Sequence, residues 1–306
     1  MQLKTITSKA AQEGPHLLIT GGVHGDEFEP MAAVRRLAGP ELPPLQRGQL
    51  TLVPVVNEPA FLRGHRTGDD ELDLARTCPG DPHGSVTEQI AHQLSELIQR
   101  ADYYIDLHTG GTTLQVLPLA GYVLHPQQDI LDQQRAMAQA FNLPIIWGTD
   151  HRLPGRSLSV ARDCGVPAIY TEYLGGGQSD PAGVDAYVQG CLNVMGSLGM
   201  IDHEQPPSKV CHVVEDPREH SGHMQICHRS PMTGFFQPTI QLGDHITAGM
   251  PLGTVCDLVG ERRETVLAEQ TGLVIVLKTF PRVSEDEALA VILETDLELD
   301  APGSAS

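Results

Sequence analysis

Hydrophobic and polar residues follow two patterns along the first two-thirds of the chain. Short apolar runs have the length and composition of buried strands, at residues 16–20, 50–56, 103–107 and 168–171. Residues 27–37 and 85–100 instead show helical spacing, and the second segment opens with Ser85 and Glu88, which predict a capping box. Strands that alternate with helices of this length predict an α/β fold with a largely parallel sheet.

The pattern changes after about residue 203. Residues 204–208 (EQPPS) have the composition of a linker. Beyond them, turn signals recur between short strand-like runs, which predicts a small all-β module. We therefore expect an α/β domain over residues 1–203, a β-rich domain over residues 208–298 and a flexible tail over residues 299–306.

The charge balance narrows the range of partners. The chain has 20 Lys and Arg residues against 39 Asp and Glu residues, a net charge of −19. Nucleic acids and anionic membranes require a basic surface, so neither is expected as a partner. No apolar run approaches the roughly 18 residues of a membrane span. The first 14 residues lack a signal-type apolar stretch, which predicts a cytoplasmic protein; a homo-oligomer is left open.

Three glycine-rich segments each begin at or just past the end of a predicted strand, at residues 21–27 (GGVHGDE), 106–111 (DLHTGG) and 171–177 (TEYLGGG). Ligands of α/β folds bind at this edge of the sheet. His24 and Glu27 are three positions apart and can point to one centre, and His108 can complete the set from another strand. Two imidazoles and one carboxylate leave the fourth position of zinc open for water, as catalytic sites require.

Asp106 lies two residues before His108, on the same face of a predicted strand, and is expected to orient an imidazole. The chain holds 14 histidines, so a single His-x-x-Glu pair would not separate metal ligands from ordinary residues. Three glycine-rich motifs in succession, each at the end of a predicted strand, do distinguish the metal-ligand candidates from the other histidines.

The order of the three motifs resembles the succinylglutamate desuccinylase/aspartoacylase family, within the wider zinc carboxypeptidase group. The resemblance covers a hydrolase domain and a β-rich C-terminal extension. It implies a mixed, largely parallel sheet flanked by helices, with a smaller barrel-sandwich-like all-β domain. It also implies that His24, Glu27 and His108 bind one zinc ion per chain, and that Glu172 is the catalytic carboxylate.

Residues 57–80 extend this resemblance. The family shows an Asn-Pro start, an arginine some residues later and an Asp-Leu-Asn-Arg-x-Phe-Pro-Gly block, which residues 73–80 (DLARTCPG) match in part. By this match, Arg66 polarises the scissile carbonyl and Arg76 holds a substrate carboxylate. A guanidinium suits both tasks because its fork matches a carboxylate bidentately.

The chain departs from the family pattern at three positions. Ala75 replaces the Asn, Cys78 replaces the Phe, and Glu58 separates the Asn from the Pro. The missing amide at position 75 removes a hydrogen-bond donor beside the expected carboxylate anchor, which leaves the choice of substrate open. Without the resemblance, the spacing of these arginines would favour a solvated loop that is paired with its own acids. The resemblance reverses this interpretation for Arg66 and Arg76, and Arg63 is expected to be structural.

The remaining candidates have weaker patterns. Arg152, Arg156 and Tyr173 flank the third motif and could line the pocket, although spacing does not separate them from surface residues. A loose histidine cluster has no cysteine pair at ligand spacing and gives little support for a second metal, at His220, His223 and His228. Residues 230–272 also resemble a biotinyl/lipoyl-type fold, but residues 257–263 lack the lysine that a carrier needs, and Lys278 lies in an apolar run.

These observations predict a zinc-dependent hydrolase that cleaves the amide bond of an N-acylated amino acid, or a related small carboxylate, to a carboxylic acid and a free amine. A zinc carboxypeptidase that acts on peptides is one alternative. A non-catalytic zinc-binding protein is another, and Glu172 argues against it, because a structural site needs no base and is usually closed by a fourth protein ligand.

Overall fold

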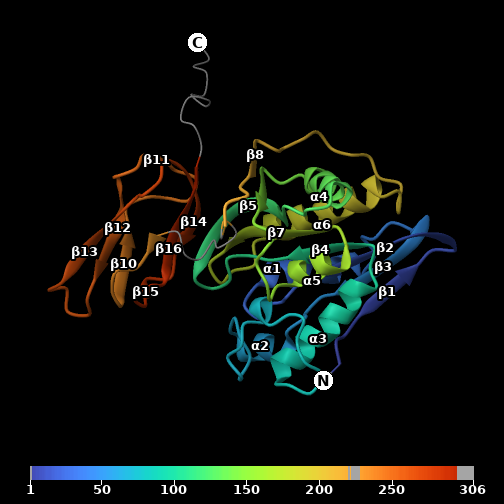
Figure 1. The fold of residues 1–306 in the computed structure, drawn as a ribbon, viewed down its shortest axis with the longest axis horizontal. Helices are drawn as coiled ribbons and strands as arrows, with labels where there is room; N and C mark the ends of the chain where they lie inside the picture. Colours follow the sequence, from blue (N-terminus) through green and yellow to red (C-terminus); the bar gives the residue numbers. More distant parts are fainter. Residues whose placement is uncertain (1, 220, 222–227, 295–306) are drawn as a thin grey trace, which may run out of the picture. The chain divides into compact units, whose positions relative to one another are not determined.

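The computed structural model describes residues 2–219, 221 and 228–294 (Figure 1). His220, His223 and the predicted tail at residues 299–306 lie outside this description. The chain forms two compact units, the first made of residues 1–112 and 118–222, and the second of residues 113–117 and 223–306. Among the described residues, no helix has the length and apolar character needed to cross a membrane.

The first unit is a mixed sheet with helices on both faces. Its strands are β1 (Ile6–Lys9), β2 (Gln12–Thr20), β3 (Arg47–Val53), β4 (Tyr103–Leu107), β5 (Leu114–Val123), β6 (Ile145–Thr149), β7 (Ala168–Gly175) and β8 (His212–Glu215). Its helices are α1 (Phe28–Leu37), α2 (Glu58–Arg63), α3 (Val86–Gln99), α4 (Gln128–Phe141), α5 (Ser157–Cys164) and α6 (Pro181–Ser197), with a 3-10 turn at Leu74–Arg76. The predicted capping box is present, since Ser85 and Glu88 exchange side-chain-to-backbone hydrogen bonds at the start of α3.

The strand order is β1-β3-β2-β4-β7-β5-β6-β8. β1 is antiparallel to β3, whereas the pairs β3–β2, β2–β4 and β4–β7 are parallel, as are β5–β6 and β6–β8. The register places Thr20 opposite Asp106, and Leu107 opposite Thr171. The carboxyl ends of β2, β4 and β7 therefore meet at one edge, where all three glycine-rich segments begin.

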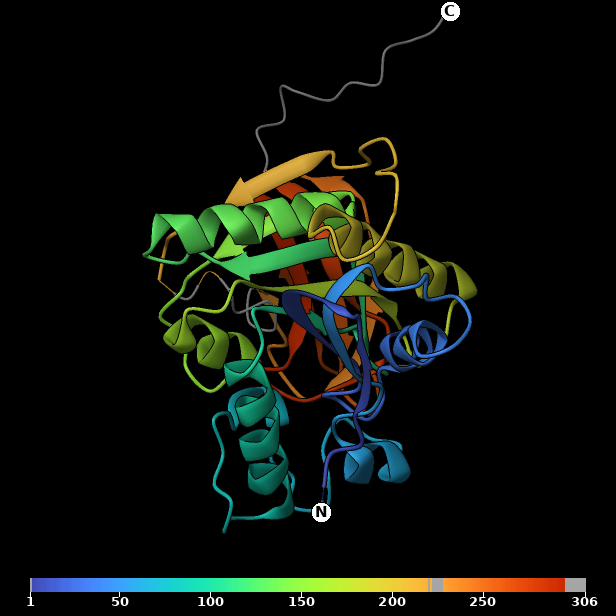
Figure 2. The ribbon, with the colours of Figure 1, turned by 90° about the vertical axis from the view of Figure 1, so that its right-hand side faces the viewer.

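Two buried clusters hold the layers together. One joins the sheet to α1, α4 and α6, and the other joins it to α3 and α5. Figure 2 shows the helices on both sides of the sheet. The apolar runs that predicted strands supply both clusters, because alternate residues of a central strand face opposite layers. β8 pairs with β6, so the first unit continues to residue 222. A division into domains at residues 203–208 stays a prediction.

The second unit contains only strands within its described residues. They are β9 (His228–Arg229), β10 (Gly234–Pro238), β11 (His245–Ile246), β12 (Pro251–Cys256), β13 (Arg263–Leu267), β14 (Gly272–Lys278), β15 (Arg282–Val283) and β16 (Ala288–Glu294), together with the start of β5. One sheet is antiparallel in the order β13-β12-β10-β15, and β14 pairs antiparallel with β16, β11 and the start of β5.

Two residues of this unit, Lys278 and His228, are considered from the sequence as a carrier lysine and as a metal ligand. Lys278 is buried in β14 and forms an ion pair with Glu287, so it is not an exposed carrier lysine. His228 is also buried. Its Nδ1 lies 3.2 Å from the Ala290 carbonyl oxygen, and its Nε2 accepts a hydrogen bond from the Glu269 backbone N–H at 3.0 Å. Both ring nitrogens are used within the protein, so His228 is not a metal ligand here.

Candidate active site

The first motif turns sharply between β2 and α1. Gly22 has a φ of +67°, which favours glycine, and a Cβ on Gly25 would lie 2.1 Å from the Ala60 carbonyl carbon. Glu27 is the N-cap residue of α1 and has extended backbone angles. This tight path directs His24 and Glu27 to the same side of the turn, as their three-residue spacing predicts.

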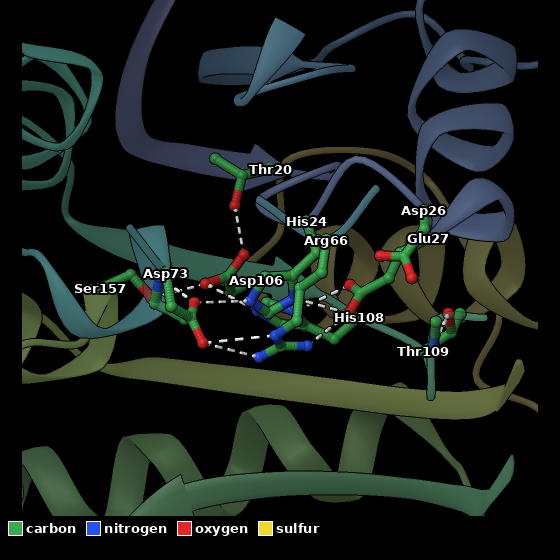
Figure 3. A network of polar contacts seen from close by, with 12 residues as sticks. Thr20, His24, Asp26, Glu27, Arg66, Asp73, Asp106, His108, Thr109 and Ser157 are labelled. Carbon is green, nitrogen blue, oxygen red and sulfur yellow. Dashed lines mark hydrogen bonds and ion pairs between the residues drawn. The ribbon is translucent and has the colours of Figure 1, made fainter. Parts of the chain in front are cut away.

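His24, Glu27 and His108 converge at the carboxyl edge of the sheet (Figure 3). His24 Nδ1 lies 2.6 Å from Glu27 Oε1, and His108 Nδ1 lies 2.9 Å from Glu27 Oε2. The candidate ligand atoms of the three side chains all lie within 4.8 Å of one another. All three residues are buried, with at most 9% of their surface exposed.

A carboxylate contacts the outer nitrogen of each imidazole. Asp106 Oδ2 lies 3.2 Å from His108 Nε2, and Asp73 Oδ1 lies 3.1 Å from His24 Nε2. Asp106 also accepts hydrogen bonds from Thr20 at 2.7 Å and from Ser157 at 2.5 Å. The sequence anticipated the first carboxylate–histidine pair but not the second, because Asp73 is 49 residues from His24.

The backbone around His108 is held by contacts from two other elements. The Tyr187 hydroxyl in α6 donates to the His108 carbonyl oxygen. Asp26 Oδ2 accepts hydrogen bonds from both the backbone N–H and the hydroxyl of Thr112, each at 2.9 Å. Asp26, inside the first motif, thus ties this motif to the loop that follows the second.

The donor set fits a divalent zinc ion. Burial alone would raise the pKa of Glu27, but the neighbouring His24 and His108 hold it well below its usual value. Glu27 is therefore an ionised carboxylate between two imidazole nitrogens, which is a common ligand set of catalytic zinc. Imidazoles whose second nitrogen contacts a carboxylate are also typical of such sites. Within the described part of the chain, no other group of His, Cys, Asp and Glu has this geometry.

Glu172 and Arg66 lie beside this cluster. Burial raises the pKa of Glu172 to about 7; Glu27 adds to the rise, while His108, His24 and Arg66 oppose it. Glu172 Oε2 is buried and has no hydrogen-bond partner among the described residues. Arg66 donates to Asp73 Oδ2 from Nε at 3.3 Å and from Nη2 at 3.1 Å, and its Nη1 lies 3.8 Å from Glu27 Oε1.

Arg76 is joined by a second arginine, Arg156. A Cβ on Gly155, which has a φ of +82°, would lie 2.5 Å from the Arg76 carbonyl oxygen, and the Cys78 N–H donates to the Gly155 carbonyl at 2.9 Å. Burial, together with the charge of Arg76, lowers the pKa of Arg156 to about 10. The sequence did not separate Arg156 from surface residues, since only close backbone packing brings its loop to residues 76–78.

The other candidates take structural positions. Arg63 Nη1 donates to the Gly68 carbonyl at 2.5 Å, and the side chain pairs loosely with Asp69 and Glu71. Tyr173 packs edge-on against Tyr187, with ring centroids 6.0 Å apart. Arg152 is exposed and donates to the Asp150 carboxylate at 2.7 Å.

Two histidines and a glutamate beside a further carboxylate, Glu172, are residue types from which metal-assisted hydrolases build their sites. The family model described as the succinylglutamate desuccinylase/aspartoacylase catalytic domain matches residues 13–198. The chain belongs to this family of deacylase-type hydrolases.

Individual relatives agree with this assignment. The chain is 34% identical over 292 residues to the N-alpha-acetyl-L-2,4-diaminobutyric acid deacetylase of Halomonas elongata, covering 92% of this chain and 83% of that protein. The product-bound structure of the ectoine utilization protein EutE (DoeB) from Ruegeria pomeroyi has a TM-score of 0.85 and 29% identity, with 95% and 88% of the two chains covered. A succinylglutamate desuccinylase/aspartoacylase from Rhodobacter sphaeroides has a TM-score of 0.84 and 28% identity over the same shares.

Proposed function

We propose that this protein is a zinc-dependent deacylase that hydrolyses the amide bond of an N-acetylated amino acid. The convergence of His24, Glu27 and His108, in a chain that belongs to a family of deacylases, carries the proposal. The Halomonas elongata relative makes N-acetyl-2,4-diaminobutyric acid the first substrate to test. The same relative favours an acylated amino acid over a peptide as substrate.

His24, Glu27 and His108 would hold one zinc ion per chain through the two Nδ1 atoms and the Glu27 carboxylate. When bound, the ion supplies a positive charge that polarises a carbonyl oxygen and makes water more acidic. Asp73 and Asp106 keep both rings oriented, because each accepts a hydrogen bond from the outer Nε2–H.

Glu172 is the proposed proton carrier. Its buried oxygen is an acceptor without a protein partner among the described residues, and its pKa of about 7 lies near neutral pH. A carboxylate of this kind takes a proton from the attacking water and then gives it to the departing amine nitrogen. The water oxygen first bonds to the carbonyl carbon, and the carbon–nitrogen bond then breaks as the amine nitrogen receives the proton, so the products are acetate and a free amine.

Three arginines provide the positive charge. Arg66 is proposed to donate to the oxyanion of the tetrahedral intermediate, an interaction worth about 2.7–4 kcal/mol when well placed. Arg76 and Arg156 come from loops that touch through their backbones, and are proposed to bind the substrate carboxylate together. In a chain of net charge −19, this pair is a local positive site that suits an anionic substrate.

The test combines metal analysis with a substrate panel. The purified protein should contain about one zinc per chain and should hydrolyse N-acetyl amino acids faster than N-succinyl or N-formyl amino acids and short peptides. Glu172→Gln should retain the zinc and lose nearly all turnover, whereas Glu204→Gln, at an exposed position, should behave as wild type. Full hydrolysis by Glu172→Gln would show that another group is the base, and a preference for peptides would replace the deacylase with a peptidase.

A further inference from the structure

Tyr170 lies on the same strand face as the proposed base. It is two residues before Glu172 in β7, and side chains two apart on a strand point the same way. Its backbone pairs with Asp106 of β4, whose side chain contacts His108. The half-buried ring packs against the apolar cluster on the α3 and α5 face of the sheet. Tyr170 therefore lies on the face of the sheet that α5 covers, and Arg156 is the residue that precedes α5.

The ring has a fixed place because β5 provides room for it at Gly121. A Cβ on Gly121 would lie 2.2 Å from Tyr170 Cε1 and 2.6 Å from its hydroxyl oxygen. Any other residue at position 121 would collide with the ring. The ring therefore lies directly over a strand position that has no side chain, and this contact holds the phenol end in place.

The hydroxyl has no hydrogen-bond partner among the described residues. Most other tyrosine hydroxyls have one, at Tyr103, Tyr104, Tyr122 and Tyr187. Burial raises the pKa of the Tyr170 phenol. Two charged groups of the proposed site also act on it, since Glu172 raises this pKa and Arg156 lowers it. A phenylalanine would fill the same space over Gly121, so packing alone does not explain the hydroxyl. The hydroxyl oxygen is not among the buried polar atoms that lack a partner, so solvent or a ligand can reach it. A ligand that accepts its hydrogen bond accounts for the hydroxyl.

We propose that Tyr170 is a substrate-binding residue whose hydroxyl donates a hydrogen bond to the substrate carboxylate held by Arg76 and Arg156. This inference rests on the proposed function. It provides a neutral donor in a site where Ala75 lacks the amide of the family pattern. Tyr170 thereby contributes to the selection of substrates that carry a carboxylate over equally sized substrates that do not.

The test compares two substrates on two variants of the zinc-loaded protein. Tyr170→Phe should raise KM for an N-acetyl amino acid about tenfold, the effect of one hydrogen bond to a charged group, with kcat changed by less than about twofold. KM for the matching carboxamide should rise clearly less, by about threefold or below, because the carboxamide keeps an oxygen acceptor but lacks the charge. Tyr173→Phe is the matched control, since its ring packs on Tyr187, with the apolar cluster on the opposite face of the sheet from Tyr170.

Equal effects on the acid and the carboxamide would overturn the proposal and leave the deacylase function intact. A Tyr170→Phe variant that does not fold would show that the hydroxyl is structural, which also overturns it. If wild type hydrolyses no N-acyl amino acid, the proposed function fails, and calorimetric titration with free 2,4-diaminobutyric acid decides the inference. Tenfold weaker binding by Tyr170→Phe would support it, and unchanged or absent binding in both proteins would refute it.

Discussion

Asp73 joins the proposed metal ligands to the proposed oxyanion donor. Its Oδ1 lies 3.1 Å from His24 Nε2 and accepts from the Ala75 N–H at 2.9 Å, while its Oδ2 accepts from Arg66. Burial would raise the pKa of Asp73, but His24 and Arg66 hold it well below its usual value, so the carboxylate is ionised at neutral pH. His24 thus donates to a full negative charge.

Asp73→Asn keeps an acceptor for His24 but removes the charge. A hydrogen bond to a charged group contributes about 1.5–3 kcal/mol, and a neutral one about 0.5–1.5 kcal/mol. The difference of about 1–1.5 kcal/mol corresponds to roughly tenfold weaker zinc binding. Asp73→Ala removes the acceptor altogether, and its loss should approach about a hundredfold, the upper range for such partners of metal ligands.

Zinc affinity is measured by competition with a chromophoric chelator, and kcat/KM is measured in parallel. Asp69→Asn is the control, because Asp69 is fully exposed and its carboxylate forms just a loose ion pair, 3.8 Å from Arg63. We expect affinity to decrease in the order wild type, Asn, Ala at position 73, with the control equal to wild type. Wild-type zinc affinity in both Asp73 variants would refute the role of this carboxylate in holding His24.

Three further predictions follow from particular contacts. Chelation should abolish hydrolysis and lower the melting temperature, because a ligand that binds only the folded state stabilises it. Added zinc should restore both. Unchanged activity in the chelated protein would exclude a required metal. Gly121→Ala should lower the free energy of unfolding in urea by about 1–3 kcal/mol through collision with Tyr170, while Gly68→Ala, where the new Cβ has ordinary contacts, should change it little. Burial lowers the pKa of His228, so below about pH 6.5 the unfolded chain takes up a proton that the folded protein does not. The free energy of unfolding should therefore fall on acidification, by up to about 1.4 kcal/mol per pH unit. His228→Gln should show a smaller decline, and an equal decline would assign the acid sensitivity to other groups.

The sequence alone predicted the features that depend on neighbouring residues. Apolar runs marked the central strands, and Ser85 with Glu88 marked the start of α3, because a strand's burial and a helix cap are decided within a few residues. The motif containing His24 and Glu27 predicted their convergence, since a three-residue spacing at a tight turn leaves little freedom. The strand ends also placed His108 at the same edge, because parallel strands end together.

Only the tertiary structure decided which side chains complete the site. Asp73 reaches His24, Arg156 joins Arg76, and Tyr170 occupies the space over Gly121. Each of these pairs is brought together by the packing of loops and strands that are distant in sequence. Such contacts depend on the path of the backbone and on the space between elements, and no periodicity or local spacing in the chain encodes either quantity.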